Sequence, residues 1–324
     1  MSNPNPNLAV VIVSWNVRDL LAACLRSLFS DIERSNLKAQ VWVVDNGSTD
    51  GSPEMVAESF PSVRLVASQE NLGFVRGNNL ALREISNLQS PTSKYVWLLN
   101  PDTEVQPGAT AALMATLETR PQAGVAGAKL LYPDGSLQHS GFRFPGLVQL
   151  AFDLFSFPGR TINVRARLYD TPLNGRYPRR LYEGDAPFPI DHPLGAAMMV
   201  RAEAIAEVGW LDEGFWMYCE EIDWCWRMRK AGWQAYCVPT ARVVHHAGKS
   251  SEQVRATTFI ALWRSRLRLY DKHYPEWKRL LAYKLVRTGM RRNIHQARTA
   301  CRRGEISADE LTARLDAYQT VLTR

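Results

Sequence analysis

The chain has 324 residues, of which 46% are hydrophobic, enough for one large α/β domain with an appendage or for two domains. The five cysteines include no Cys-x-x-Cys pair, which argues against a disulfide framework and a cysteine zinc site. The N-terminus is polar and no apolar run reaches ~20 residues, which argues against a signal peptide and a membrane span. We therefore expect a cytoplasmic protein. The net charge of +7 arises in residues 255–324, which carry 16 Lys/Arg and 6 Asp/Glu.

The first part of the chain alternates strand-like and helix-like stretches. The apolar runs that read as strands are 8–16, 39–47, 63–68 and 94–100. The stretches with helical spacing of apolar residues are 18–29, 52–60, 76–85 and 108–118. Such alternation is typical of a mainly parallel sheet that is covered by helices on both faces.

The pattern is less regular from residue 131 onward. Residues 131–144 resemble a hairpin, and 145–190 are rich in Pro, Arg and aromatic residues without a clear period, which indicates a functional loop or a poorly ordered one. The remaining predicted elements are a strand at 192–200, a helix at 220–233, strand-like segments at 234–248 and basic helices from 255. We therefore expect one domain over residues 1–254 and a basic helical segment over 255–324.

Two aspartates follow apolar strands. Asp45 ends the second run, and Asp102 follows the fourth run after the turn-forming pair Asn100-Pro101. Parallel strands end at the same edge of a sheet, so both carboxylates are expected at the edge where open α/β sheets bind ligands. Each can serve as a turn former or helix cap. Alternatively, one accepts a hydrogen bond from a nucleobase and the other holds Mg²⁺ or Mn²⁺.

Three acidic residues, Glu220, Glu221 and Asp223, begin an amphipathic helix, where the helix dipole alone favours negative charge. Apolar residues three, four and seven positions after Glu221 share its side of the helix. This pattern predicts that Glu221 points into a cleft, where desolvation would raise its pKa and suit it to act as a general base. Glu220 and Asp223 would then face solvent or support it.

Other motifs narrow the class of protein and the choice of histidine for a site. The first strand–helix turn, SWNVRD, has no glycine, and neither a G-x-G-x-x-G nor a P-loop motif occurs, which argues against dinucleotide-binding and P-loop proteins. Two histidines, His245 and His246, end a strand, so their side chains point to opposite faces and at most one of them faces the cleft.

Six stretches in this order resemble the family 2 glycosyltransferases of the GT-A fold, particularly the bacterial rhamnosyltransferase-like branch. They are VVIVSWN, VVDNGSTDGS, ENLGFVRGNN, YVWLLNPDTEV, GAAMMVRAEAIAEVGWLDEGFWMYCEEIDWCWRMRKAGW and VVHHAGKSS, and they span about residues 8–251. The resemblance implies a Rossmann-like nucleotide-sugar half over about 1–105 and an acceptor half over 106–254. It also implies an inverting transfer of a sugar to a glycan or polyprenyl-diphosphate-linked glycan in cell-surface polysaccharide synthesis.

The resemblance implies a role for particular residues. Asp45 matches the carboxylate that binds the nucleobase, Asp102 matches the last aspartate of the D-x-D metal motif, and Glu221 matches the catalytic base. Asn100 stands where many members have Asp, so Asp102 is the acidic ligand that remains. His245 matches the histidine that completes the metal site, with His246 as the alternative. The residues that match donor-contacting loops are Ser14, Asn16, Asn71, Gly73 and Asn79.

The resemblance favours dTDP-rhamnose as donor, with UDP- or GDP-sugars as alternatives, because Asp45 can pair with the N3–H of either thymine or uracil. Two other functions stay open, a sugar-nucleotidyltransferase and an inactive glycan-binding relative. Within 255–324, Trp and Tyr residues are interleaved with Arg and Lys, which suits either an anionic membrane surface at the inner face of the cell membrane or a solvated basic face. RNA binding is the lesser alternative, and no nucleic acid partner is expected.

Overall fold

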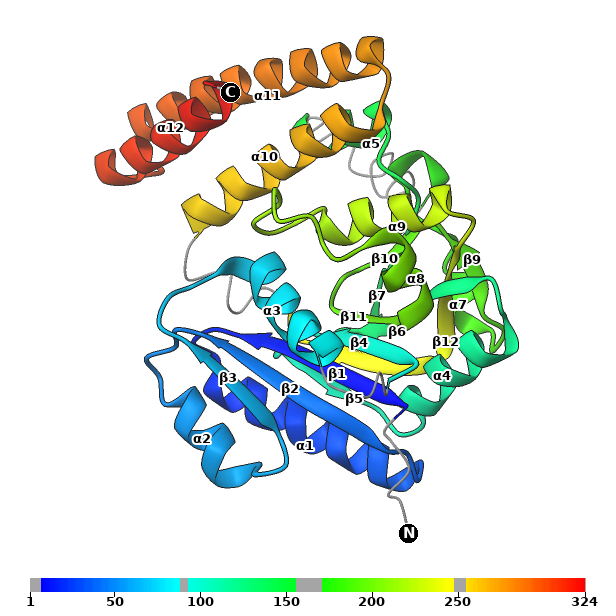
Figure 1. The fold of residues 1–324 in the computed structure, drawn as a ribbon. Helices are drawn as coiled ribbons and strands as arrows, with labels where there is room; N and C mark the ends of the chain where they lie inside the picture. The colour runs from blue at the N-terminus through cyan, green and yellow to red at the C-terminus, as the bar shows by residue number, and fades with distance from the viewer. Residues whose placement is uncertain (1–6, 88–92, 156–170, 248–254, 324) are drawn as a thin grey trace. The chain divides into compact units, whose positions relative to one another are not determined.

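The computed structural model describes residues 7–87, 93–155, 171–247 and 255–323 (Figure 1). The chain forms two compact units. Unit 1 comprises the described residues within 1–144, 176–216 and 220–250, and unit 2 those within 145–175, 217–219 and 251–324. This division differs from the predicted break after residue 254, because a helix from the irregular region buries its apolar side chains among the C-terminal helices.

A ten-stranded sheet forms the centre of unit 1, with its main strands in the order β3-β2-β1-β4-β11-β6-β12-β5, while β7 pairs with β6 and β9 with β12. Its strands are β1 (Leu8–Ser14), β2 (Ala39–Asn46), β3 (Arg64–Ser68), β4 (Tyr95–Leu99), β5 (Thr103–Val105), β6 (Ala123–Leu131), β7 (Leu137–Gln138), β9 (Phe188–Ile190), β11 (Ala197–Arg201) and β12 (Gln234–His245). A separate two-stranded sheet pairs β8 (Gly141–Phe142) with β10 (His192–Pro193).

Most of the strands in this sheet share one direction. The parallel pairs are β1 with β2, β2 with β3, β1 with β4, and β6 with β12, whereas β11 runs antiparallel between β4 and β6. The predicted α/β class with a mostly parallel sheet is therefore confirmed. The predicted strand at 192–200 is in fact two short strands, β10 and β11, because the chain turns away from the sheet at residues 194–196.

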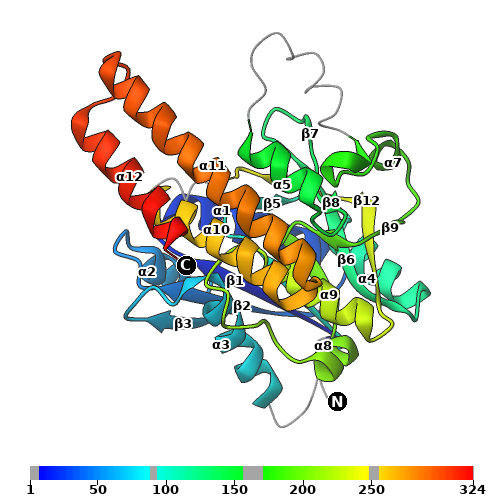
Figure 2. The same cartoon turned by 90° about the horizontal axis from the view of Figure 1, so that it is seen from above.

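Helices cover both faces of the sheet (Figures 1 and 2). The helices of unit 1 are α1 (Arg18–Arg34), α2 (Ser52–Ser59), α3 (Gly73–Asn87), α4 (Ala109–Thr119), α7 (Arg180–Glu183), α8 (Ala202–Val208) and α9 (Glu220–Lys230). Alternate residues of β1 show the two faces. Leu8, Val10 and Ile12 belong to the core formed with α1, α2 and α4, whereas Val13 lies against α3. Burial on both faces explains why the strand sequences are continuously apolar.

Asp31 in α1 holds the start of α4. It is 2% exposed, and its carboxylate accepts hydrogen bonds from the backbone N–H groups of Gly108 and Thr110 and from the Thr110 hydroxyl. The first residues of a helix have no intrahelical acceptor for their N–H groups. Asp31 therefore caps α4 from another helix, since α4 has no side-chain cap of its own.

Replacing Asp31 by Ala is expected to destabilise unit 1 by about 2–4 kcal/mol, because it removes a cap and leaves three donors unsatisfied in the core. Urea unfolding followed by tryptophan fluorescence measures this change. Asp19→Ala, which alters an exposed carboxylate of the same helix, serves as the control and should change stability by less than about 0.5 kcal/mol. Equal effects of the two substitutions would contradict the capping role.

Unit 2 has its own apolar core. Its helices are α5 (Leu147–Leu154), the 3₁₀ helix η2 (Pro172–Asn174), α10 (Arg255–His273), α11 (Glu276–Arg302) and α12 (Ala308–Leu322). The core side chains are Leu150, Leu154, Trp263, Leu267, Tyr270, Ala282, Val286, Met290 and Val321. The basic C-terminal segment is thus helical, as the sequence predicted, and these helices pack through apolar faces. Among the residues that the structure covers, no helix is both long and apolar enough to cross a bilayer.

Candidate active site

The carboxyl ends of β1 and β2 carry buried polar atoms that have no hydrogen-bond partner within the part of the chain that the structure describes. Ser14 and Asp45 are paired in register, and each is 1% exposed. Asp45 accepts a hydrogen bond from Ser48 N through Oδ2 at 2.9 Å, but its Oδ1, like Ser14 Oγ and Asn46 Oδ1, has no partner among the described residues. Leaving a buried polar atom unsatisfied costs about 1–3 kcal/mol. Ser14 Oγ and Asp45 Oδ1, which lie in register on adjacent strands, are thus available to hydrogen-bonding groups of a ligand, whereas Asn46 Oδ1 lies beside Gly77 on the α3 side.

Asn16 fixes the loop next to this site. Its backbone has a φ of 50°, in the left-handed region that asparagine tolerates better than most residues. Asn16 N donates to Ser48 Oγ at 2.9 Å, and Asn16 Oδ1 accepts from Thr49 N at 2.8 Å. Asn16 therefore ties the end of β1 to the turn after β2, and so shapes the surroundings of Asp45.

The start of α3 borders the same edge. Asn71 Oδ1 accepts a hydrogen bond from Gly73 N at 2.9 Å, and Gly73 O accepts one from Asn46 Nδ2 at 3.1 Å. Gly73 has a φ of 78°, and a Cβ atom there would lie 2.4 Å from Trp216 Nε1. Glycine is therefore required by both the backbone conformation and the close approach of the tryptophan ring.

Asn79 has a different position from the one that the resemblance implied. Its side chain is 1% exposed, and its Nδ2 donates to Leu211 O and Glu213 Oε1 while its Oδ1 accepts from Leu211 N. These bonds use the amide to hold the loop before α9. The donor-binding role is not what the structure shows for Asn79, because its polar atoms are already engaged within the protein.

Asp102 and His245 lie together because of one strand pairing. The turn at Asn100-Pro101 leads from β4 into β5, and β5 pairs with the end of β12 so that Thr103 faces His245. His246 N also donates to Asp102 O at 2.9 Å. As a result, His245 Nε2 lies 3.3 Å from Asp102 Oδ1, and both side chains are buried. His246 lies elsewhere, with its Nε2 2.6 Å from Glu104 Oε1.

The chemistry of this pair fits a divalent cation. Gln138 Oε1 lies 2.9 Å from His245 Nδ1, and since an amide oxygen only accepts, Nδ1 carries the proton. With the Nδ1 proton directed to Gln138, Nε2 is the nitrogen that can offer a lone pair to a cation beside Asp102 Oδ1. An imidazole whose other nitrogen donates to an oxygen is the usual arrangement of a metal-binding histidine. In the part of the chain that the structure covers, no third His, Cys, Asp or Glu joins them.

Glu221 lies close to the chain that carries this pair. Its side chain packs against Gly195, where a Cβ atom would lie 3.6 Å from Glu221 Cβ. The next residue, Ala196, accepts a hydrogen bond from Asn100 N at 2.8 Å through its carbonyl oxygen. Glu221 is therefore connected to the turn at Asn100 through Gly195 and Ala196, all within unit 1. The Asn100 side chain is half-buried, and its backbone oxygen accepts from Thr103 Oγ1.

Burial sets the protonation of the two glutamates that begin α9. Burial raises the pKa of Glu221 to about 7, and Glu221 Oε2 has no partner among the described residues. The pKa of Glu220 is raised well above its usual value by burial and then by the charge of Glu221. Burial thus favours the protonated form of Glu220, whereas Glu221 can exchange a proton near neutral pH. The alternative that Glu220 faces solvent is wrong, since it is 5% exposed.

Asp223 supports the helix from within the protein and does not face solvent. It is fully buried and pairs with Arg227 Nε at 2.9 Å. Arg227 also donates to the carbonyl oxygens of Val208 and Trp210, at 2.5 and 2.7 Å. Asp223 and Arg227 therefore fix α9 against the end of α8. The approach to α9 is strained, because Tyr218 and Cys219 have φ values of 68° and 66°.

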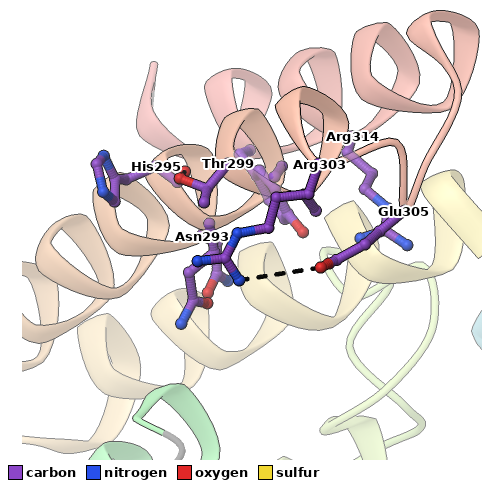
Figure 3. Close-up of a pocket in the computed structure, with 10 residues that line it drawn as sticks. Asn293, His295, Thr299, Arg303, Glu305 and Arg314 are labelled. Carbon is purple, nitrogen blue, oxygen red and sulfur yellow. Dashed lines mark hydrogen bonds and ion pairs between the residues drawn. The ribbon is translucent and has the colours of Figure 1, made fainter.

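A polar groove lies within unit 2, between α11 and α12 (Figure 3). Its volume is about 440 Å³, and Arg303 and Glu305 form an ion pair of 3.9 Å across part of it. The residues that line it are Asn293, His295, Gln296, Ala297, Thr299, Ala300, Arg303, Glu305, Arg314 and Tyr318. None of the predicted site residues is among them, and the groove has no buried acid like Glu221.

Sequence comparisons show which family the chain resembles. The family model described as Glycosyl transferase family 2 matches residues 9–204. An N-acetylglucosaminyl-diphospho-decaprenol L-rhamnosyltransferase from Mycobacterium tuberculosis H37Rv is 30% identical over 302 residues, which cover 91% of this chain and 94% of that protein. Rhamnosyltransferase WbbL from Escherichia coli K12 is 22% identical over 242 residues, 74% of this chain and 83% of that protein.

Solved structures share the fold. A mannosyltransferase, PcManGT from Pyrobaculum calidifontis, solved with GDP-Man and Mn²⁺, superposes with a TM-score of 0.54 at 17% identity and covers 99% of this chain and 88% of that one. GalNAc-T7, solved with UDP, GalNAc and Mn²⁺, gives a TM-score of 0.55 at 17% identity over 74% of this chain and 43% of that one. These two likenesses confirm the predicted GT-A fold class.

Proposed function

The chain belongs to glycosyltransferase family 2, and from that premise we propose that it moves L-rhamnose from dTDP-rhamnose to a glycan on a polyprenyl diphosphate. The observation that carries the proposal is one edge of the sheet. Ser14 and Asp45, whose Oγ and Oδ1 have no partner among the described residues, end β1 and β2, and Asp102 follows the neighbouring parallel strand β4. His245, at the end of β12, lies beside Asp102. The choice of rhamnose is supported by two relatives that are named as rhamnosyltransferases, one of which acts on a decaprenol-linked substrate.

Glu221 is the general base of the proposed reaction. It removes the proton from an acceptor hydroxyl, and the resulting oxygen attacks the anomeric carbon from the side opposite the diphosphate. The bond between that carbon and the diphosphate oxygen breaks, so dTDP leaves with the electron pair and the configuration inverts. A base with a pKa near 7 is well matched to this step, since it is ionised for much of the time yet basic enough to accept a proton.

Asp102 and His245 are the residues that would hold Mg²⁺ or Mn²⁺. When bound there, the ion would neutralise the charge that develops on the leaving diphosphate. Mg²⁺ is commonly held by one or two protein carboxylates together with substrate phosphates, so a set of two protein residues is compatible with such an ion. Gln138 keeps the His245 imidazole in the tautomer that this role needs, and Asn100 turns the chain so that Asp102 reaches the site.

Asp45 is expected to recognise the base of the donor, because its Oδ1 can accept the N3–H of thymine or uracil. Asp45→Ala should weaken dTDP binding about 10–100-fold, the usual range for losing a hydrogen bond to a charged group. Calorimetric titration of both proteins with dTDP measures this. Titration with pyrophosphate and Mn²⁺ is the control and should be unchanged. If pyrophosphate loses affinity equally, Asp45 does not read the base.

The rate of transfer should rise with pH and level off above about pH 7. The sign follows from the role of Glu221, because only its ionised form accepts a proton and burial moves its ionisation up to that range. The dependence of kcat/KM on pH in the wild-type enzyme shows the rise. A rate that falls between pH 6 and pH 8, or one that is constant there, would contradict the assignment of Glu221 as the base.

The direct test of the proposed function is a transfer assay with dTDP-rhamnose, Mn²⁺ and a short-chain polyprenyl-diphosphate N-acetylglucosamine acceptor. The expected result is a rhamnosylated product of inverted configuration, with dTDP released in equal amount. The same assay with UDP- and GDP-sugars tests the other donors, and the proposal places the reaction at the cytoplasmic face of the membrane. Binding of donors without any transfer would favour an inactive glycan-binding relative, and formation of a sugar nucleotide from dTTP would favour a nucleotidyltransferase.

A further inference from the structure

One face of α11 in unit 2 combines exposed apolar residues at its start with a basic stripe along its length. Trp277, Leu280 and Leu281 are 61%, 60% and 44% exposed, an unusual grouping because most large apolar side chains are buried. Residues three, four and seven positions apart lie on the same side of a helix. By this spacing the same side carries the exposed cations Lys284, Arg287, Arg291, Arg298 and Arg302.

This side of α11 is strongly positive and unneutralised. The helix contains eight Lys/Arg and one acidic residue, Glu276, which lies near Arg279 on another side. Within the described residues, none of the five cations on the exposed side pairs with a carboxylate. The opposite side of the helix is buried in the core of unit 2 through Ala282, Val286 and Met290. The exposed side is therefore a surface that the packing of unit 2 leaves open.

We propose that this side of α11 is a docking surface for an anionic lipid bilayer. Trp277, Leu280 and Leu281 would enter the interface between headgroups and acyl chains, where tryptophan is favoured, and the cations would lie along the charged headgroups. A helix of 27 residues is about 40 Å long, so its basic stripe can contact many lipids at once. The inference deepens the proposed function and rests on it, since a polyprenyl-linked acceptor lies in a membrane.

The combination of residues favours lipid over nucleic acid. A nucleic-acid surface uses cations for phosphates and aromatic rings for stacking on bases. Here a single tryptophan is accompanied by two exposed leucines, which suit acyl chains and offer nothing to a base. The apolar residues also occupy one end of the helix and the cations the rest, as expected for a helix whose end enters a bilayer while its remaining length stays at the charged surface.

Sedimentation of the full-length protein with lipid vesicles tests the proposal without needing donor, acceptor or activity. Vesicles of phosphatidylcholine alone are compared with vesicles containing phosphatidylglycerol, at low and high salt. The wild-type chain should sediment with the anionic vesicles only, and less at high salt. The triple variant Lys284→Glu, Arg287→Glu and Arg291→Glu should bind at least about a hundredfold more weakly, given the attraction of each cation to an anionic surface.

Two further variants make the test specific. Replacing Trp277, Leu280 and Leu281 by Ser should also weaken binding to anionic vesicles, which a purely electrostatic contact would not show. The triple change Arg26→Glu, Arg34→Glu and Lys230→Glu reverses three exposed charges in unit 1 and should leave vesicle binding as in the wild type, apart from the smaller net charge. Thermal unfolding confirms that all variants fold.

Three outcomes would overturn the proposal. They are absence of wild-type binding to anionic vesicles, equal losses in the two charge-reversal variants, and binding of single-stranded RNA but not vesicles through the α11 cations. The transfer assay with a water-soluble acceptor analogue separates this proposal from the proposed function. The α11 variants should retain wild-type rates with that acceptor, whereas failure of transfer in the wild type itself would concern the proposed function and leave the vesicle result standing.

Discussion

Replacing Glu221 by Gln is expected to lower the rate of sugar transfer by about a thousandfold, within the usual range for loss of a general base. Glutamine has nearly the same shape, so the packing against Gly195 is kept while the ability to accept the proton is lost. The affinity for dTDP should be unchanged, because Glu221 acts on the acceptor. Single-turnover transfer and calorimetric titration measure the two quantities.

Glu220→Gln is the matched control for this experiment. Burial and the charge of Glu221 keep the pKa of Glu220 well above its usual value, which favours its protonated form, and glutamine resembles that form in charge and shape. Transfer by this variant should stay within a few-fold of wild type. If Glu220→Gln is the slow variant and Glu221→Gln the active one, the two roles are reversed and the assignment made from the fold is wrong.

Thermal unfolding of Glu221→Gln at pH 8 checks that the lost activity is not a loss of folding. The pKa of Glu221 is raised in the folded protein, so ionisation of this group costs stability as the pH rises from its unfolded-state pKa to about 7, and at pH 8 this cost is fully present. Glutamine removes that cost. The variant should therefore unfold at the same temperature as the wild type at pH 8, or at a higher one, and a lower temperature would indicate a structural defect.

The second large effect is expected for Asp102→Asn, which should abolish the part of dTDP affinity that depends on Mn²⁺. Asparagine keeps the size of the side chain but removes the negative charge that, in the proposed site, would hold a cation beside His245 Nε2. Gln138→Ala, which frees the other nitrogen of His245, should have a smaller effect, about 10–100-fold in metal affinity, as is typical for residues that orient a metal ligand.

Glu104→Gln is the control for the metal-site variants. Glu104 lies two residues from Asp102 and pairs with His246, so it tests whether any carboxylate in this strand would have the same effect. Metal-dependent binding in this variant should equal that of the wild type. Loss of Mn²⁺ dependence in Glu104→Gln but not in Asp102→Asn would place the ion at the His246 pair and contradict the site described above.

The sequence predicted the sheet and the edge at which Asp45 and Asp102 lie, because both depend on local patterns. Continuous apolar runs such as that of β1 indicate buried parallel strands, and the strand ends then bring Asp45 and Asp102 to one edge. The roles of these residues and of Glu221 stay predictions that the experiments above test. For Asp102 the structure adds the pairing of β5 with β12, which selects His245 over His246 as its neighbour.

The features that the sequence did not reveal depend on contacts between distant segments. Asn79 looked like a donor ligand because of its motif, but the loop at Leu211, which engages it, is 132 residues away in sequence. Gln138 lies in a two-residue strand that no sequence pattern predicts. Only the folded chain brings it into contact with His245. The same is true of α5, whose apolar residues are recognisable but whose place in the core of unit 2 is not.

Calorimetric titration of the wild-type protein with dTDP, UDP, GDP and ADP, with and without Mn²⁺, is the decisive experiment for the proposed donor site. We expect dTDP to bind best, UDP to follow, and both to bind more tightly with the ion, since in the proposed site Asp45 would read the base while Asp102 and His245 would hold the cation beside the diphosphate. Failure of all four nucleotides to bind, with or without Mn²⁺, would contradict the donor site at the edge of the sheet.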